Sequence, residues 1–148
     1  MKFEAQSVTF SGVRSQAVVR SVPVPEGPVL IGVAGFVQGE EYPLWRGATV
    51  VIGRSRSCDI SLRRCKAWLA LAPEQRDEER DFKTVSRKHV RLSYSDERCV
   101  EIEDLSSNGT YLDGLKITRV VIQDLQEQGH ELRLGTQERL RLEWRSQG

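Results

Sequence analysis

Short runs in which apolar and polar residues alternate make up most of the chain. Val90, Leu92 and Tyr94 alternate with polar residues, and the same pattern returns at 139–144. Such alternation gives a β-strand one buried face and one solvated face. Turn-forming residues separate the runs at intervals of about 8 to 12 residues, which is typical of an all-β, antiparallel sandwich. Further strands are expected at 29–37, 47–52, 98–103, 119–123 and 130–134, with hairpin turns at Asn108-Gly109 and Asp113-Gly114.

Two segments interrupt this pattern and divide the chain. Residues 1–28 end in VPVPEGP, whose prolines favour an N-terminal arm or an extra edge strand. Residues 29–145 are expected to form the domain itself. Within it, residues 63–83 are an insertion far longer than the usual connection of about 4 to 6 residues, and Pro73 favours a short surface helix there. The apolar residues of the insertion are expected to pack against the sandwich, namely Trp68, Leu69 and Leu71.

Length and charge narrow the classes of function. A chain of 148 residues forms one domain with its own core and needs no cofactor to fold. With 22 Lys and Arg against 21 Asp and Glu, the net charge of +1 argues against nucleic acid as the main ligand. The sequence has neither a signal-peptide pattern nor an apolar run of about 18 residues, so a cytoplasmic protein without membrane contact is expected.

The cysteines and histidines do not form a recognisable metal or disulfide pattern. Cys58, Cys65 and Cys99 are odd in number and lie outside any CxxC pair, and the chain has 2 histidines. Disulfide frameworks and zinc sites need paired ligands at characteristic spacings. Free thiols are therefore expected, and neither a metal nor a cofactor.

Three polar turns carry the candidate chemistry. Gly53 and Arg54 follow the apolar run ATVVI, with Ser55 and Arg56 beside them. Ser86-Arg87-Lys88-His89 comes just before the next alternating strand, and Ser106-Ser107-Asn108-Gly109-Thr110 follows EIEDL. Loops that join antiparallel strands often gather at one end of a sandwich, so these turns are expected to form one small cationic surface.

Phosphate is the anion that such a surface suits. A phosphate monoester carries about −1.5 to −2 charges and three acceptor oxygens. Arginine forks, serine hydroxyls and exposed backbone amides are the donors that match it. The side-chain amide of Asn108 both donates and accepts, which suits the backbone of an extended peptide.

The three blocks together resemble the signature of the forkhead-associated (FHA) domain, a reader of phosphothreonine peptides. They occur in the family's order, and the resemblance covers roughly residues 29–145. It implies an SMAD/FHA-like sandwich of about eleven strands whose end loops grip phosphothreonine more tightly than phosphoserine, with the peptide's position +3 setting sequence preference. The first block is G-R at Gly53-Arg54 together with D-I-S-L at 59–62, the second is S-R-x-H at 86–89 and the third is D-L-S-S-N-G-T at 104–110.

The resemblance also implies roles for individual residues. Arg54, Ser86 and Arg87 would hold the phosphate. The peptide main chain would be held by Ser107 and Asn108. Matches to loop-shaping positions of the family are Gly53, His89 and Gly109, and further contributors to the cationic surface are Ser55, Arg56 and Lys88.

The implied function is that of an adaptor without catalytic activity, acting in Ser/Thr kinase signalling. Its partner would be a threonine-phosphorylated protein, such as a kinase or a kinase substrate. One departure from the family is the insertion at 63–83, which separates the first two blocks beside the expected binding face. It either extends the peptide site or covers it.

Other interpretations of these residues remain open or are excluded. Ser86 and His89 alone would suit a hydrolase, but neither a third orienting acid nor a G-x-S-x-G elbow is evident, so no enzyme is expected. A phosphate-independent assembly protein that uses the insertion or the arm is the alternative function. Thr9 in the arm is a candidate phosphorylation site through which the protein would associate with itself. A basic cluster beside Trp68 comprises Arg63, Arg64 and Lys66. Such a cluster is typical of a solvated face, although the same pattern also occurs in nucleic-acid contacts.

Overall fold

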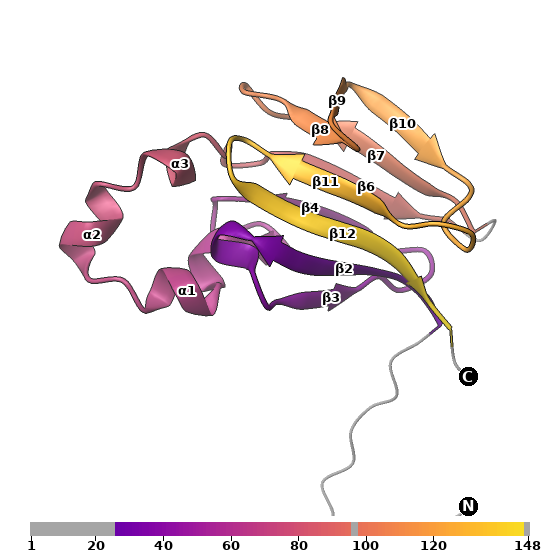
Figure 1. Cartoon of the computed structure of the whole chain (residues 1–148), viewed down its shortest axis with the longest axis horizontal. Helices are drawn as coiled ribbons and strands as arrows, with labels where there is room; N and C mark the ends of the chain where they lie inside the picture. Colours follow the sequence, from indigo (N-terminus) through magenta and orange to yellow (C-terminus); the bar gives the residue numbers. More distant parts are fainter. Residues whose placement is uncertain (1–25, 96–97, 147–148) are drawn as a thin grey trace, which may run out of the picture.

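The chain folds into two β-sheets that pack face to face, shown by the computed structural model for residues 26–95 and 98–146 (Figure 1). Within these ranges there are eleven strands. One sheet has the order β10-β7-β6-β4-β5 and the other β3-β2-β12-β11-β8-β9. The first comprises β4 (Thr49–Gly53), β5 (Ile60–Ser61), β6 (Val90–Tyr94), β7 (Val100–Asp104) and β10 (Arg119–Ile122). The second comprises β2 (Gly27–Ala34), β3 (Glu41–Pro43), β8 (Thr110–Leu112), β9 (Leu115–Ile117), β11 (His130–Leu134) and β12 (Glu138–Arg145).

The alternating pattern of the sequence explains how the sheets pack. In β6, the apolar residues at alternate positions are buried and the two polar residues between them are only partly so. Strands β7 and β12 show the same alternation, and their apolar side chains meet between the sheets. Burying one such side chain contributes about 1.5 to 3 kcal/mol. The predicted all-β sandwich is confirmed, with β4 and β5 forming its one parallel pair among the described strands.

Predictions for two turns have opposite outcomes. Asp113-Gly114 joins β8 to β9, which pair in one sheet, so that hairpin is confirmed. The hairpin predicted at Asn108-Gly109 is wrong, because β7 and β8 lie in different sheets and the segment between them crosses from one sheet to the other. The short strands β3, β5, β8 and β9 were not predicted, since two or three residues are too few to show alternation.

The insertion at 63–83 is an arch of short helices. After the 3-10 turn η2 (Leu62–Arg64) come α1 (Lys66–Leu69), α2 (Pro73–Asp77) and α3 (Arg80–Lys83). The helix predicted at Pro73 is therefore present, although it is one of three. Trp68 is buried as expected and Leu71 partly so, whereas Leu69 is 58% exposed, and the prediction for that residue is wrong.

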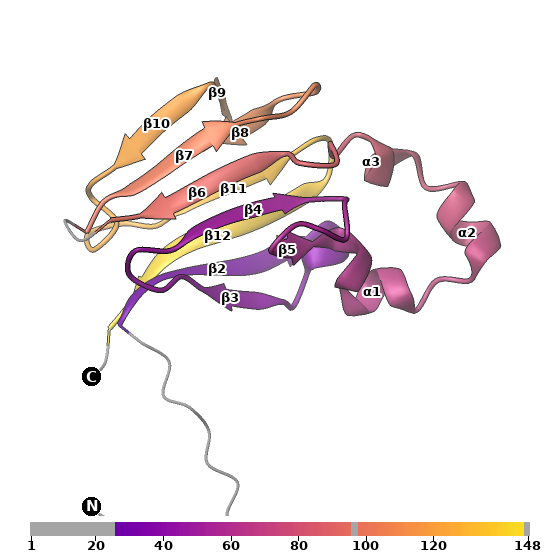
Figure 2. The same cartoon turned by 180° about the vertical axis from the view of Figure 1, so that it is seen from behind.

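The arch projects from one end of the sandwich. In both views, α1 and α3 lie nearest the sheets and α2 lies farthest away (Figures 1 and 2). The carboxyl end of β4 and the turn between β11 and β12 point toward this end, while β2 begins and β12 finishes at the opposite one (Figure 2). Another 3-10 turn, η1 (Gly35–Val37), follows β2. The predicted N-terminal arm, apart from residues 26–28, and Thr9 lie outside the described residues.

Candidate functional site

Three polar segments lie together at the end of the sandwich that carries the insertion. The backbone N–H of Arg54 donates to the carbonyl of Ser86 at 3.0 Å, and the N–H of Ser55 donates to the carbonyl of Arg87 at 3.1 Å. The N–H of Ser107 donates to the Ser86 hydroxyl oxygen at 3.0 Å. Segments that are distant in sequence are thus held in contact by hydrogen bonds, as the sequence predicts.

Gly53 is required because the backbone of the second segment approaches it closely. A Cβ atom at Gly53 would lie 2.1 Å from the carbonyl oxygen of Arg87, which is far inside van der Waals contact. The missing side chain therefore allows the two hydrogen bonds between Arg54, Ser55 and the facing segment to form. Gly53 shapes the site without lining it.

His89 joins the second segment to the third from inside the protein. Its side chain is 0% exposed, and Nδ1 accepts from the backbone N–H of Ser86 at 3.0 Å. Nε2 lies 2.8 Å from the carbonyl oxygen of Gly109. Since an N–H only donates and a carbonyl only accepts, the proton of the neutral ring is on Nε2. Burial lowers the pKa of His89, which keeps the ring neutral and makes it a structural linker.

A network around Asp104 shapes the third segment. Its Oδ1 accepts from the N–H and hydroxyl of Ser106, at 3.0 and 2.6 Å, and from the Thr110 hydroxyl at 2.7 Å. Partial burial would raise the pKa of Asp104, but these hydrogen bonds outweigh it and lower the pKa. The Ser106 hydroxyl oxygen also accepts from the N–H of Gly109 at 2.7 Å, whose φ of 104° favours glycine.

The side chains of Ser107 and Asn108 are exposed at the tip of this segment. Asn108 Nδ2 donates to the carbonyl oxygen of Thr84 at 2.9 Å, so the amide is fixed to the last turn of the insertion. In the described part of the chain, the amide oxygen has no hydrogen-bond partner. Asn108 is therefore oriented by the protein and still has an acceptor to offer to a ligand.

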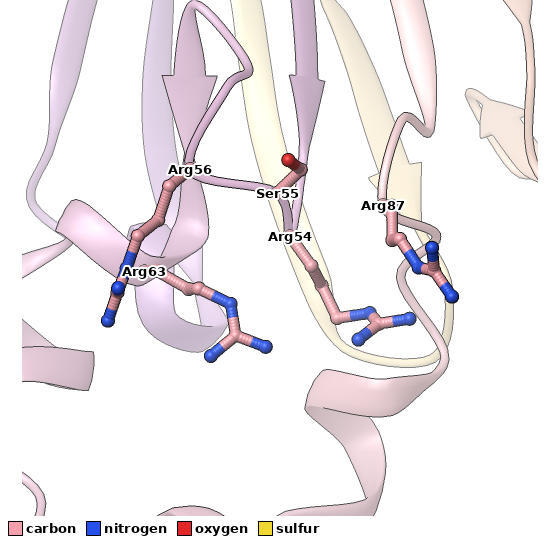
Figure 3. A pocket seen from close by; sticks show the side chains of 5 residues that line it. All are labelled: Arg54, Ser55, Arg56, Arg63 and Arg87. Carbon is pink, nitrogen blue, oxygen red and sulfur yellow. The ribbon is translucent and has the colours of Figure 1, made fainter.

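A cationic pocket of about 380 Å³ opens beside these segments (Figure 3). Figure 3 shows the Arg54 guanidinium between those of Arg63 and Arg87. Ser55 and Arg56 complete the lining, although the Ser55 hydroxyl interacts with that of Ser57 at 2.8 Å. Of the other residues predicted for the site, these do not line the pocket: Ser86, Lys88, Ser107 and Asn108.

Within residues 26–95 and 98–146, the guanidiniums around this pocket have no carboxylate partner. Among the described residues, Arg54, Arg63 and Arg87 take part in no ion pair, and Arg54 Nε donates to the carbonyl of Val85. Partial burial and then the nearby charges of Arg63 and Arg87 lower the pKa of Arg54. Like charges held this close, without internal neutralisation, favour an anion as ligand.

Ser86 directly precedes the pocket residue Arg87, and its hydroxyl has a proton to offer. Its oxygen accepts from the Ser107 N–H, and no acceptor for its own hydrogen is present in residues 26–95 or 98–146. Arg54 and the facing Ser86-Arg87 segment therefore present two guanidiniums and one hydroxyl donor on adjoining backbone. These are the donors that three phosphate oxygens require.

Arg63 is a pocket residue that the sequence analysis placed on a solvated face. Its guanidinium carbon lies 5.3 Å from the centre of the Phe82 ring and 5.8 Å from that of Trp68. The only signal in the sequence was its position directly after the D-I-S-L block, where η2 turns the chain back toward Arg54. Asp104, Ser106 and Thr110 lie inside a block that the sequence did single out, but their network was not predicted.

Neither a metal-binding cluster nor a membrane-spanning helix is found in the described ranges. They contain no group of three or more His, Cys, Asp and Glu side chains able to hold a metal ion. Their short helices lack the length and apolar character that crossing a membrane demands. Cys58, Cys65 and Cys99 form no disulfide within these ranges.

Comparisons with known proteins agree with this geometry. The family model described as "FHA domain" matches residues 50–135. A search of the curated proteins finds no match for this sequence. The solution structure of the FHA domain of an Arabidopsis thaliana hypothetical protein is similar at a TM-score of 0.61 and 25% identity, over 90% of this chain and 98% of that one.

Two further solved structures share the fold. The FHA domain of the CT664 protein from Chlamydia trachomatis has a TM-score of 0.59 at 24% identity, over 80% of this chain and 98% of that one. The N-terminal FHA domain of S. cerevisiae Rad53p, solved in complex with a phosphothreonine peptide, has a TM-score of 0.55 at 18% identity. That match covers 80% of this chain and 94% of the yeast domain.

Proposed function

The chain belongs to the FHA domain family, and we propose that it binds threonine-phosphorylated peptides at the end of the sandwich that carries the cationic pocket. FHA domains are phosphothreonine-peptide-binding modules, and the yeast relative was solved with such a peptide. The observation that carries the proposal for this chain is the set of guanidiniums of Arg54, Arg63 and Arg87 around one pocket, none of which forms an ion pair within the described residues.

The phosphate is held by groups of two neighbouring segments. Arg54 and Arg87 neutralise its charge, and the Ser86 hydroxyl donates to one of its oxygens. Ser107 and Asn108 hold the main chain of the extended peptide beside it, and Asn108 is already oriented by its bond to Thr84. Each charge-assisted hydrogen bond contributes about 1.5 to 3 kcal/mol net, part of which offsets the ordering of the peptide. Dissociation constants in the low micromolar range, about −8 kcal/mol, are expected.

Replacement of the central arginine tests the proposal. Arg54→Ala should weaken binding of a phosphothreonine peptide by about 2 to 5 kcal/mol, because the phosphate then lacks its most enclosed partner. Isothermal titration calorimetry against an oriented phosphothreonine peptide library measures this, with the unphosphorylated peptides as blanks. Arg80→Ala is the matched control, since Arg80 is exposed on α3 and lies outside the pocket. Equal affinity of the Arg54→Ala and wild-type proteins would exclude the assigned role.

In the cell, we infer an adaptor that brings a phosphorylated partner of a Ser/Thr kinase pathway to this domain without catalysing a reaction. The alternative, assembly that does not depend on phosphate, makes the opposite prediction for a phosphatase. Treating a captured partner with phosphatase should abolish its binding to the adaptor. A partner that stays bound after complete dephosphorylation would favour the assembly protein.

A further inference from the structure

A second pocket adjoins the first and is formed largely by the insertion. Its volume is about 310 Å³, and it shares Arg54 and Arg63 with the first pocket. Residues of the insertion provide the rest of its wall: Trp68, Pro73, Arg76, Asp77, Phe82 and Lys83. The insertion therefore extends the cationic surface beyond the three family blocks and leaves the first pocket open.

The floor of the second pocket is a pair of stacked aromatic rings. Trp68 and Phe82 lie parallel with centroids 3.7 Å apart, and both are almost completely buried. Phe36 of η1 packs edge-on against both, at 5.2 and 5.8 Å, which fixes the stack to the sandwich. The short helices of the insertion are thus anchored at α1 and α3 by one aromatic cluster.

The arginines of this pocket lie over these rings. The guanidinium carbon of Arg63 is 5.3 Å from the centre of Phe82, and that of Arg76 is 5.7 Å from the centre of Trp68. A cation held against a ring face is positioned without using its N–H donors. In the described ranges the Arg63 guanidinium has no acceptor, whereas Arg76 donates from one Nη to the carbonyl of Leu69 at 3.2 Å and its buried Nε has no acceptor.

The charges of the second pocket do not cancel. Four cations line it, Arg54, Arg63, Arg76 and Lys83, against one carboxylate, Asp77. None of the four cations forms an ion pair within the described residues. Base stacking on the exposed face of a tryptophan, as in single-stranded nucleic-acid binding, is not available, because Trp68 is 3% exposed and stacked on Phe82.

We propose that this pocket is a second anion subsite, which binds another phosphorylated residue of the same peptide beside the phosphothreonine. The proposal rests on the proposed function, because the first phosphate places the peptide. Since the pockets share Arg54 and Arg63, the two phosphates lie close together. An extended peptide advances about 3.3 to 3.6 Å per residue, so the second phosphate belongs a few residues from the first.

Peptides with one and two phosphates test this directly. Each peptide of a series keeps one phosphothreonine and carries one phosphoserine, which is placed in turn at about four positions on either side. Each position moves the phosphoserine by about 3.3 to 3.6 Å along an extended chain. At the best spacing, the doubly phosphorylated peptide should bind at least about tenfold more tightly than the singly phosphorylated one, which is about 1.4 kcal/mol. Its affinity should also fall more steeply with salt, because more charges are neutralised.

Variants locate the second phosphate. The pair Arg76→Gln and Lys83→Gln should reduce the ratio of the two affinities to near one, whereas Arg80→Gln, from the same insertion but outside both pockets, should preserve it. Thermal unfolding of each variant checks that the insertion stays folded. A peptide with glutamate in place of phosphoserine shows whether a carboxylate is able to replace the second phosphate. An equal gain in affinity would support the anion subsite, with an acidic side chain as its ligand.

The outcomes separate the two proposals. Failure of every singly and doubly phosphorylated peptide to bind would overturn the proposed function. Binding of the phosphothreonine peptide without any gain from a second phosphate at any spacing would overturn the second subsite alone. A gain that survives in the Arg76→Gln, Lys83→Gln protein would place the second phosphate elsewhere and would also overturn it.

Discussion

Replacement of His89 tests how the binding loops are held in place. The imidazole is 0% exposed and joins the Ser86 N–H to the Gly109 carbonyl, at 3.0 and 2.8 Å. In His89→Ala, the Ser86 N–H loses its partner inside the protein, whereas the Gly109 carbonyl keeps only the long hydrogen bond from the Gly135 N–H at 3.5 Å. A buried polar group left without a hydrogen bond costs about 1 to 3 kcal/mol, which applies in full to Ser86 and in part to Gly109. The void left by the ring adds to this loss.

This loss is a substantial fraction of the stability of a domain, which is about 5 to 15 kcal/mol. For a chain of 148 residues, each 1 kcal/mol lowers the Tm by about 2 to 4 °C. The His89→Ala protein should therefore melt at least about 2 °C below the wild type. Because Ser86 and Gly109 belong to the loops beside the pocket, the folded fraction of the variant should also bind phosphopeptide more weakly.

Urea unfolding followed by tryptophan fluorescence gives the free energy, since the chain has 3 tryptophans. His89→Gln serves as a partial rescue, because one carboxamide is able to replace one of the two bonds. Lys88→Ala is the control, because Lys88 is next to His89 in the chain and its side chain is exposed. Its free energy of unfolding should differ from that of the wild type by no more than about 0.5 kcal/mol. A loss below about 1 kcal/mol in His89→Ala would refute the idea that this ring holds the loops together.

Two further predictions concern a close contact and a pH dependence. Gly53→Ala should cost about 1 to 3 kcal/mol in urea unfolding and weaken phosphopeptide binding, because its Cβ would overlap the Arg87 carbonyl; wild-type stability and affinity would contradict this. Burial alone would lower the pKa of His130, but hydrogen bonds and charges of Asp113 and Asp124 raise it. The ion pairs of protonated His130 therefore stabilise the folded protein fully below the ordinary histidine pKa. This stabilisation is lost as the pH rises through the higher pKa of His130 in the folded protein. Accordingly, the wild type should exceed His130→Asn in stability by more at pH 6 than at pH 8.5, and a constant difference would argue against the ion pairs.

The sequence predicts the sandwich because its signal is repeated many times. Strand β6 illustrates this, since Val90, Leu92 and Tyr94 are buried at alternate positions as the pattern requires. The Asn108-Gly109 turn shows the limit of the same reasoning. Its backbone preference is local, but the choice between a hairpin and a crossing depends on which strands pair, and β8 pairs with β11 and β9.

In the candidate site too, features encoded by neighbouring residues are predictable, whereas those that depend on contacts between distant residues are not. The blocks around Arg54, Ser86 and Asn108 are short and contiguous, so they are visible in the sequence. Arg63 was assigned to a solvated face because charged runs usually are solvated. Its place in the pocket depends on a ring stack between Trp68 and Phe82, which are separated along the chain by the whole of α2. No periodic pattern reports such a contact.

The insertion lengthens the gap between the first two blocks without separating them in space, because both of its ends are fixed. At the start, the Arg64 guanidinium donates to the carbonyl of Cys58 at 2.6 Å, which holds the loop that follows Arg54. At the end, the Thr84 carbonyl accepts from Asn108 at 2.9 Å, and its hydroxyl oxygen accepts from the N–H of Thr136 at 3.1 Å.

With its ends held, the extra length costs little. Doubling a loop adds only about 0.6 kcal/mol of closure entropy, and the aromatic cluster of Phe36, Trp68 and Phe82 offsets this by burying apolar surface. The residues between the blocks are then free to contribute Arg63, Arg76 and Lys83 to the cationic face. Although the net charge of the chain is only +1, cations that form no ion pair within the described residues gather at one end of the sandwich, because the ion pairs lie elsewhere.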